Sequence, residues 1–166
     1  MDENCGIKAM LSTVRNGYDD QIESLNVFKS QARTVFSSSS IIISLVSVLQ
    51  IFSTIPEGFK GLFQAIIAGI IILYIVLVVL SLIVLSPAAW TTPVKLDWDI
   101  LASYFGEENE RNTILKETSA YLGAIDENRK TVIERRRMTL WQGIIFGVIV
   151  ILVIIAGVLP HLIGIL

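Results

Sequence analysis

Three long stretches of the chain contain no Asp, Glu, Lys or Arg, and segments rich in these residues separate them. The uncharged stretches are residues 35–54, 61–94 and 138–166. A mainly apolar run of more than about 18 uncharged residues predicts a transmembrane helix. We therefore expect three transmembrane helices, at residues 35–53, 62–86 and 140 to about 159, with an external loop at 54–61.

The polar segment before the first span, residues 1–34, has an apolar pattern typical of a helix. Its apolar residues follow three- and four-residue spacing, with Gln21 at the one polar position of the series. About three heptads of such a pattern is the lower limit for a coiled coil, so two interpretations stay open. The segment is either a packed helical stalk or an amphipathic helix that packs on its own chain. The apolar positions are Leu11, Val14, Tyr18, Leu25, Phe28, Ala32 and Val35.

The central polar segment, residues 87–139, predicts two further helices. Residues 96–105 form a short amphipathic pattern that Gly106 ends. A longer helix is expected from residue 108 to 139, and it continues into the third span because no strong stop precedes Trp141. The fold class predicted is therefore all-α: a polytopic membrane protein with three transmembrane helices, whose N-terminal and central cytosolic helices run parallel and form a stalk.

The distribution of Lys and Arg predicts the orientation in the membrane. Four basic residues precede the first span, one (Lys60) lies in the loop after it, and eight lie between residues 87 and 141. Segments rich in Lys and Arg stay in the cytoplasm. We expect a multi-pass protein of the inner (plasma) membrane with a cytoplasmic N-terminus. The end of the segment 140–166, around Pro160-His161-Leu162, is expected outside.

Composition and residue types argue against catalysis and nucleic-acid binding. Charged residues make up 17% of the chain, against about 25% in a typical soluble domain. The expected cytosolic segments carry nearly equal numbers of acidic and basic residues, so they create no basic field for a nucleic acid. His161 and Cys5 are the single residues of their types, and no cluster has metal-ligand spacing. We expect no enzyme activity, no cofactor and no metal.

The first span carries a row of serines along one face. Ser37, Ser40, Ser44 and Ser47 fall within an arc of about 80° at 100° per residue, and Gln50 continues the row. Ser38 and Ser39 lie off it. The same spacing runs backwards into the polar segment through Arg33, Ser30, Asn26, Glu23 and Asp19. Such a face either packs against other helices or lines water, and three helices per chain can enclose a pore only within a ring of subunits.

Small residues and an arginine triplet complete the candidate sites. Gly143 and Gly147 form a GxxxG pattern in the third span, and Gly61, Ala65 and Gly69 repeat every four residues in the second. These patterns permit close helix contacts, within one chain or between chains. The triplet Arg135, Arg136 and Arg137 either binds an anionic ligand or anchors the chain to anionic lipid, where each basic residue contributes about 1 kcal/mol.

The arrangement resembles the small prokaryotic transmembrane effectors of cyclic-nucleotide anti-phage signalling, the Pycsar systems. The shared features are Lys29-Ser-Gln-Ala32 leading into a serine-rich span, a second span ended by Pro87, and a helix at residues 121–137 that feeds the last span. The resemblance implies a cytosolic nucleotide ligand whose binding triggers oligomerisation and loss of membrane integrity.

The function expected is a homo-oligomeric, channel-like or membrane-disrupting effector controlled by its cytosolic helices. The alternative is a non-conducting accessory or scaffold subunit that binds partner membrane proteins. In either case the lipid bilayer is a partner, and the two alternatives differ in whether the exposed polar face meets water or protein.

Overall fold

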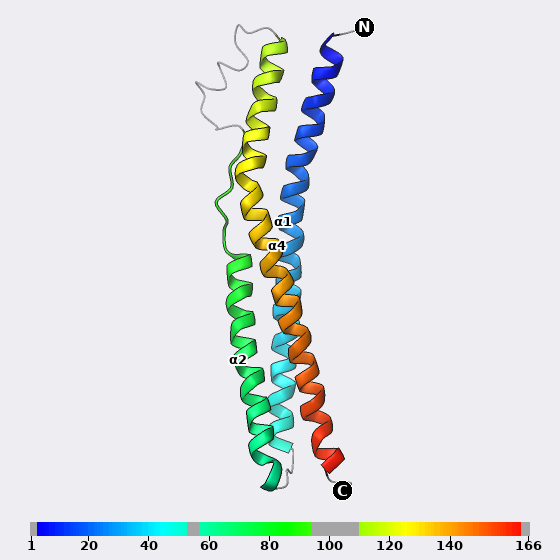
Figure 1. Ribbon diagram of the computed structural model, residues 1–166, viewed down its shortest axis with the longest axis vertical. Helices are drawn as coiled ribbons and strands as arrows, with labels where there is room; N and C mark the ends of the chain where they lie inside the picture. Colours follow the sequence, from blue (N-terminus) through cyan, green and yellow to red (C-terminus); the bar gives the residue numbers. More distant parts are fainter. Residues whose placement is uncertain (1–2, 53–56, 94–109, 164–166) are drawn as a thin grey trace. The chain divides into compact units, whose positions relative to one another are not determined.

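The computed structural model describes residues 3–52, 57–93 and 110–163, and these residues are almost entirely helical (Figure 1). Helix α1 spans Glu3–Phe52, a 3-10 turn η1 spans Glu57–Phe59, helix α2 spans Lys60–Leu85 and helix α4 spans Glu110–Ile163. The described residues contain no strand. The all-helical fold class is therefore confirmed.

Two helices run without a break from a polar segment into an apolar one. Helix α1 has 50 residues and passes through residues 34 and 35, and helix α4 has 54 residues and passes through residues 139 and 140. The continuity of α4 was predicted from the absence of a strong helix stop, and that of α1 from the three- and four-residue spacing that runs on into the first span. Helix α4 ends at Ile163 rather than near residue 159. The short helix expected at residues 96–105 lies outside the described residues.

The chain divides into two compact units. The first unit comprises Met1–Val27 and Pro87–Arg135, and the second comprises Phe28–Ser86 and Arg136–Leu166. Each unit takes one part of α1 and one part of α4. The two units are described separately below.

In the first unit, α1 and α4 pack in parallel. Arg15 pairs with Glu117, the Tyr18 ring contacts the Tyr121 ring, and the Gln21 amide donates to the Ile125 carbonyl at 3.1 Å. Residue numbers rise together along these contacts, which fixes the parallel direction that the sequence predicted. The predicted apolar positions of α1 in this unit are buried or half-buried, namely Leu11, Val14, Tyr18 and Leu25.

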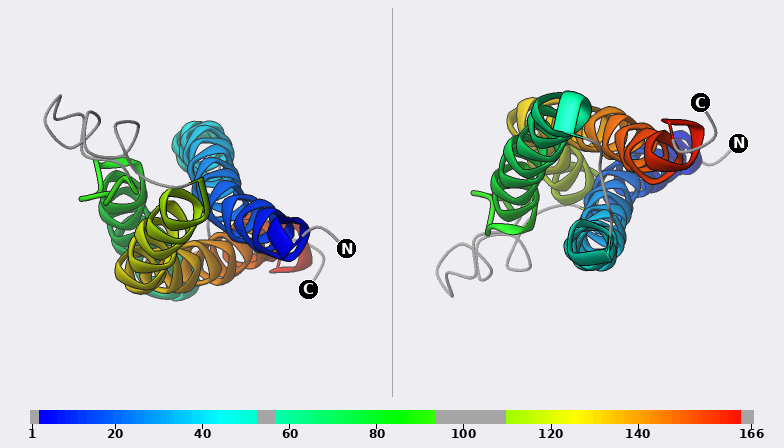
Figure 2. Two further views of the ribbon diagram at one scale, coloured as in Figure 1. Left: turned by 90° about the horizontal axis from the view of Figure 1, so that it is seen from above. Right: turned by 90° about the horizontal axis from the view of Figure 1, so that it is seen from below.

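In the second unit, apolar residues of all three helices form one core. Figure 2 shows these helices seen along their length. Helix α2 is uncharged after Lys60 and ends where Ser86 turns to ψ 149°, the extended conformation that a following proline imposes. The Ser86 hydroxyl donates to the Ile83 carbonyl at 2.7 Å. This gives a hydrogen-bond partner to one of the carbonyls in the last turn of the helix. The core comprises Val46 of α1, Phe63, Ile67, Ile70 and Leu77 of α2, and Ile149 and Ala156 of α4.

Two helices are long and apolar enough to cross a membrane: Lys60–Leu85 and, within α4, Arg111–Val158. Only 22% and 17% of their most apolar windows are buried inside the chain. The core helix of a soluble protein would be mostly buried, whereas the described residues leave most of each window uncovered. The expected first span, residues 35–53, is not one of the two, and its serines lower its hydropathy.

Replacing Leu77 with alanine is expected to destabilise the second unit. Leu77 is fully buried at the centre of the three-helix core, so the substitution removes contacts and leaves a cavity, at a cost of about 2–5 kcal/mol. Thermal unfolding of the purified protein in detergent measures the effect. Leu82→Ala is the matched control, because Leu82 lies on the same helix and is 60% exposed. Equal losses for the two variants would contradict this core.

Candidate functional site

The predicted serine face lies largely on the outside of the second unit. Ser37, Ser44 and Ser47 are exposed and Ser40 is half-buried. The exposed apolar side chains Ile41 and Leu45 lie beside them on α1. The chain therefore does not cover this polar face with its own helices, apart from one contact at Ser40. Gln50 lies within α1, but its side chain lies outside the described residues.

The serine hydroxyls donate to carbonyls of their own helix. Ser40 donates to Phe36 at 2.9 Å, Ser44 to the Ser40 carbonyl at 2.9 Å, and Ser47 to Ile43 at 3.0 Å. This bonding satisfies each hydroxyl proton and leaves oxygen lone pairs free to accept. Ser40 also lies 3.3 Å from the Tyr74 hydroxyl of α2. Ser40, Ser44 and Ser47 can therefore meet another helix or water without leaving a hydroxyl donor unpaired.

The candidate glycines make no close contacts within this chain. A side chain added at Gly61, Gly69, Gly143 or Gly147 would find no atom of the described structure within 4 Å, and Ala65 is exposed. Both interpretations of these glycines, close helix contact within one chain and close contact between chains, stay predictions.

The arginine triplet cannot act as one cluster on one face, because consecutive helical residues point about 100° apart. Arg135 is half-buried, whereas Arg136 and Arg137 are exposed. The two exposed guanidinium groups are available to anions from solvent or from lipid.

A buried polar pair in the second unit was not predicted. Gln142 of α4 donates from Nε2 to Ser81 Oγ of α2 at 3.0 Å, and Ser81 donates to the Leu77 carbonyl at 2.9 Å. Both side chains are fully buried, and Gln142 Oε1 has no hydrogen-bond partner among the described atoms. The available sequence signal was a single amide within the apolar run that begins at residue 138. The pair joins α2 and α4 through this one side-chain hydrogen bond.

A polar and aromatic cluster joins three segments of the first unit. Trp90 donates from Nε1 to the Tyr18 hydroxyl at 2.8 Å, and Tyr18 packs edge-on against Tyr121 with ring centroids 5.5 Å apart. The Arg15 guanidinium lies 5.8 Å from the Tyr121 ring centroid. Its hydrogen bond to Glu117 raises the pKa of Arg15, so the side chain stays charged. Trp90 is thus a half-buried packing residue of this unit.

The segment after α2 is held to α4 by two hydrogen bonds between the Asn128 side chain and the Thr91 backbone, which we call the amide clasp. Asn128 donates from Nδ2 to the Thr91 carbonyl and accepts from the Thr91 backbone N–H, each at 2.9 Å. The Thr91 hydroxyl donates to Glu127 at 2.7 Å. Asn128 is 2% exposed, and its side-chain amide gives hydrogen-bond partners to both the backbone N–H and the carbonyl of Thr91. The clasp fixes residues 90 and 91 against the α1–α4 pair.

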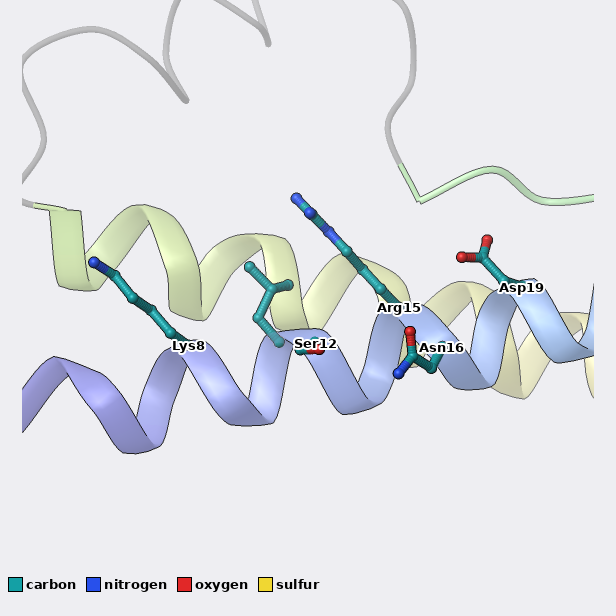
Figure 3. A pocket seen from close by; sticks show the side chains of 6 residues that line it. Lys8, Ser12, Arg15, Asn16 and Asp19 are labelled. Atoms are coloured by element: carbon teal, nitrogen blue, oxygen red, sulfur yellow. The ribbon is translucent and has the colours of Figure 1, made fainter.

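A shallow hollow of about 290 Å³ lies on the first unit (Figure 3). Its lining comes from one helix, α1, and includes Lys8, Arg15 and Asp19, which extend from the same side of that helix in Figure 3. Arg15 is already paired with Glu117. The hollow is therefore a surface depression rather than an enclosed site for a ligand.

Neither similarity to known proteins nor a metal site among the described residues identifies a family or a function for this chain. No protein-family model, no curated protein and no solved structure matches this chain. Within residues 3–52, 57–93 and 110–163, no group of three or more His, Cys, Asp or Glu side chains is arranged to hold a metal ion. The candidate site therefore rests on the outward serine face and on the buried polar contacts.

Asn128→Asp is expected to destabilise the first unit by about 1–3 kcal/mol, because the carboxylate accepts from Thr91 but cannot donate to its carbonyl. Burial and the nearby Glu127 would raise the pKa of the introduced carboxyl. Its protonated form restores the donor, so the loss of stability should shrink as pH falls from about 8 to about 5. Thermal unfolding across this range measures the loss. Asn16→Asp, at an exposed amide, should show no such loss. A loss of stability that stays the same across this pH range would contradict the hydrogen bond that the Asn128 amide donates to the Thr91 carbonyl.

Gln142→Leu is expected to leave the unfolding temperature unchanged or to raise it. Leucine fills nearly the same volume and removes the buried Oε1 that lacks a partner, while Ser81 keeps its bond to Leu77. Gln142→Ala loses the same hydrogen bond and also leaves a cavity, so it should lower the unfolding temperature. If both variants lower it equally, the amide pair itself stabilises the contact between α2 and α4.

Proposed function

We propose that this chain is an integral membrane protein that acts as a homo-oligomeric, channel-like or membrane-disrupting effector. In this proposal the chain crosses the membrane three times, with residues 1–34 and 87–139 in the cytoplasm and the C-terminus outside. The outward apolar faces of α2 and α4 support the membrane setting. The basic residues of the central segment support the orientation.

The observation that carries the proposal is the exposure of the serine face. Ser37, Ser44 and Ser47 point outward from a unit whose other outward residues are mainly apolar. A polar row in contact with lipid loses the partners that water or protein would supply to its oxygen lone pairs. Copies of the chain that bring these faces together would cover the row and, in a ring, would surround a path for water.

The second candidate function is a non-conducting subunit that holds partner membrane proteins. The observation that favours it is that the hydroxyls of Ser40, Ser44 and Ser47 already donate within α1, so dry packing leaves no donor unpaired. The open glycines Gly143 and Gly147 also suit close helix contact. This function predicts stoichiometric co-purification with another membrane protein and no ion flux.

Ser40→Leu together with Ser44→Leu is expected to abolish ion flux in proteoliposomes, because leucine makes the lining apolar over two helical turns. Ser44→Leu alone separates this effect from the contact between Ser40 and Tyr74. The control is Ile41→Leu with Leu45→Ile, which alters the same turns of α1 and leaves the serine face intact. Flux that persists in both serine variants would favour dry packing and the scaffold function.

A further inference from the structure

Helix α4 carries a second row of residues that the first unit leaves uncovered. The row follows three- and four-residue spacing, and all six of its members are exposed: Leu115, Ser119, Leu122, Asp126, Arg129 and Ile133. The buried positions of this part of α4 belong to a different face, marked by Ile114, Thr118 and Asn128. The six residues are called the outer row.

Half of the outer row is apolar although it lies in the polar part of α4. Leu115, Leu122 and Ile133 are 42%, 45% and 56% exposed. Single exposed apolar residues are ordinary on a protein surface. Three that recur along one helical face at heptad positions have the pattern of a helix-pairing seam. In the proposed topology this part of α4 is cytosolic, so lipid cannot cover the seam.

The two charges of the outer row have opposite signs and are three residues apart. Neither Asp126 nor Arg129 makes an ion pair with the described residues. When two copies of α4 run parallel about a two-fold axis, residues at equal heights face each other. Asp126 of each copy then lies within reach of Arg129 of the other. Asp126 and Arg129 also meet their own counterparts, as Leu115, Leu122 and Ile133 do, but each charge has the opposite charge of the other copy within reach, so the four charges of the contact sum to zero.

We propose that the outer row is a parallel contact between the α4 helices of two copies of this chain. The inference rests on the homo-oligomeric membrane protein proposed above, because copies inserted with one topology necessarily run parallel. The row complements itself in both apolar pattern and charge, so a second copy satisfies it without a partner of another sequence. The contact uses α4 alone and involves none of the serine face of α1.

In the second unit, the same spacing along α4 supports this contact independently. The count continues through Arg136 to Leu140, which is 61% exposed, and to Gly143 and Gly147, where an added side chain would meet no atom of the chain. Paired glycines let two parallel helices approach closely within lipid. Arg136 would face its counterpart at the proposed membrane surface, where anionic headgroups screen like charges.

Disulfide cross-linking in native membranes tests the proposal. In a Cys5→Ser background, Leu122→Cys and Ile133→Cys are oxidised mildly and run on a non-reducing gel. Both are expected to give a several-fold larger dimer fraction than Glu134→Cys, which is exposed next to Ile133 but lies on another face of α4. A dimer fraction as large for Glu134→Cys would show random collision and would overturn the proposal.

Charge reversal provides a second test that needs no change in the apolar positions. In the Leu122→Cys background, Asp126→Arg should reduce the dimer fraction, because the contact would then carry four positive charges and no negative one. The double exchange Asp126→Arg/Arg129→Asp should restore it. Failure of the double exchange to restore it, with the protein still folded by its unfolding temperature, would contradict the pairing of Asp126 with Arg129.

Amine-reactive cross-linking of the same membranes separates the two proposals. If multimer bands appear but neither Leu122→Cys nor Ile133→Cys gives a disulfide dimer, the outer-row contact is overturned. The proposed homo-oligomer then stands. An absence of multimers by both reagents would overturn both proposals.

Discussion

A seven-residue repeat along α1 and α4 is the constraint on which the structure depends. The buried positions of α4 include Ile114, Asn128, Gln142, Ile149 and Ala156, all separated by multiples of seven. In α1 the buried positions are Tyr18, Ala32, Ser39 and Val46, again separated by multiples of seven. Because each helix buries one continuous stripe, its other faces are left for lipid, water or further protein.

The repeat explains why polar residues are buried in both units. For the two buried amides a neighbouring segment supplies the partner: Thr91 for Asn128, and Ser81 for Gln142. Ser39 instead donates to the Phe36 carbonyl of its own helix. Trp90 and Thr91 are consecutive, and they bond to α1 and α4 respectively. The segment that follows α2 is thereby fixed by directional bonds, whereas the core of the second unit depends mainly on apolar contacts.

Much of the fold could be predicted from the sequence, because helices and apolar seams follow from local spacing. The seam from Leu11 to Leu25 and the continuity of both long helices are examples. The partners of Trp90 and Gln142 could not be predicted, since they depend on which segments meet in space. The sequence placed Ser39 off the serine row, and its burial follows from the seam, which continues from Ala32 into the next turns. Of the serine row, Ser37, Ser44 and Ser47 are exposed and Ser40 is half-buried.

A single copy of this chain leaves its serine face and its outer row uncovered, so assembly with further copies is the central proposal. The most direct measurement is the mass of the purified protein in lipid nanodiscs, with the mass of lipid and scaffold subtracted. The account predicts a discrete multiple of the 18.4 kDa chain that persists on dilution. A particle that contains one chain at every concentration would contradict it.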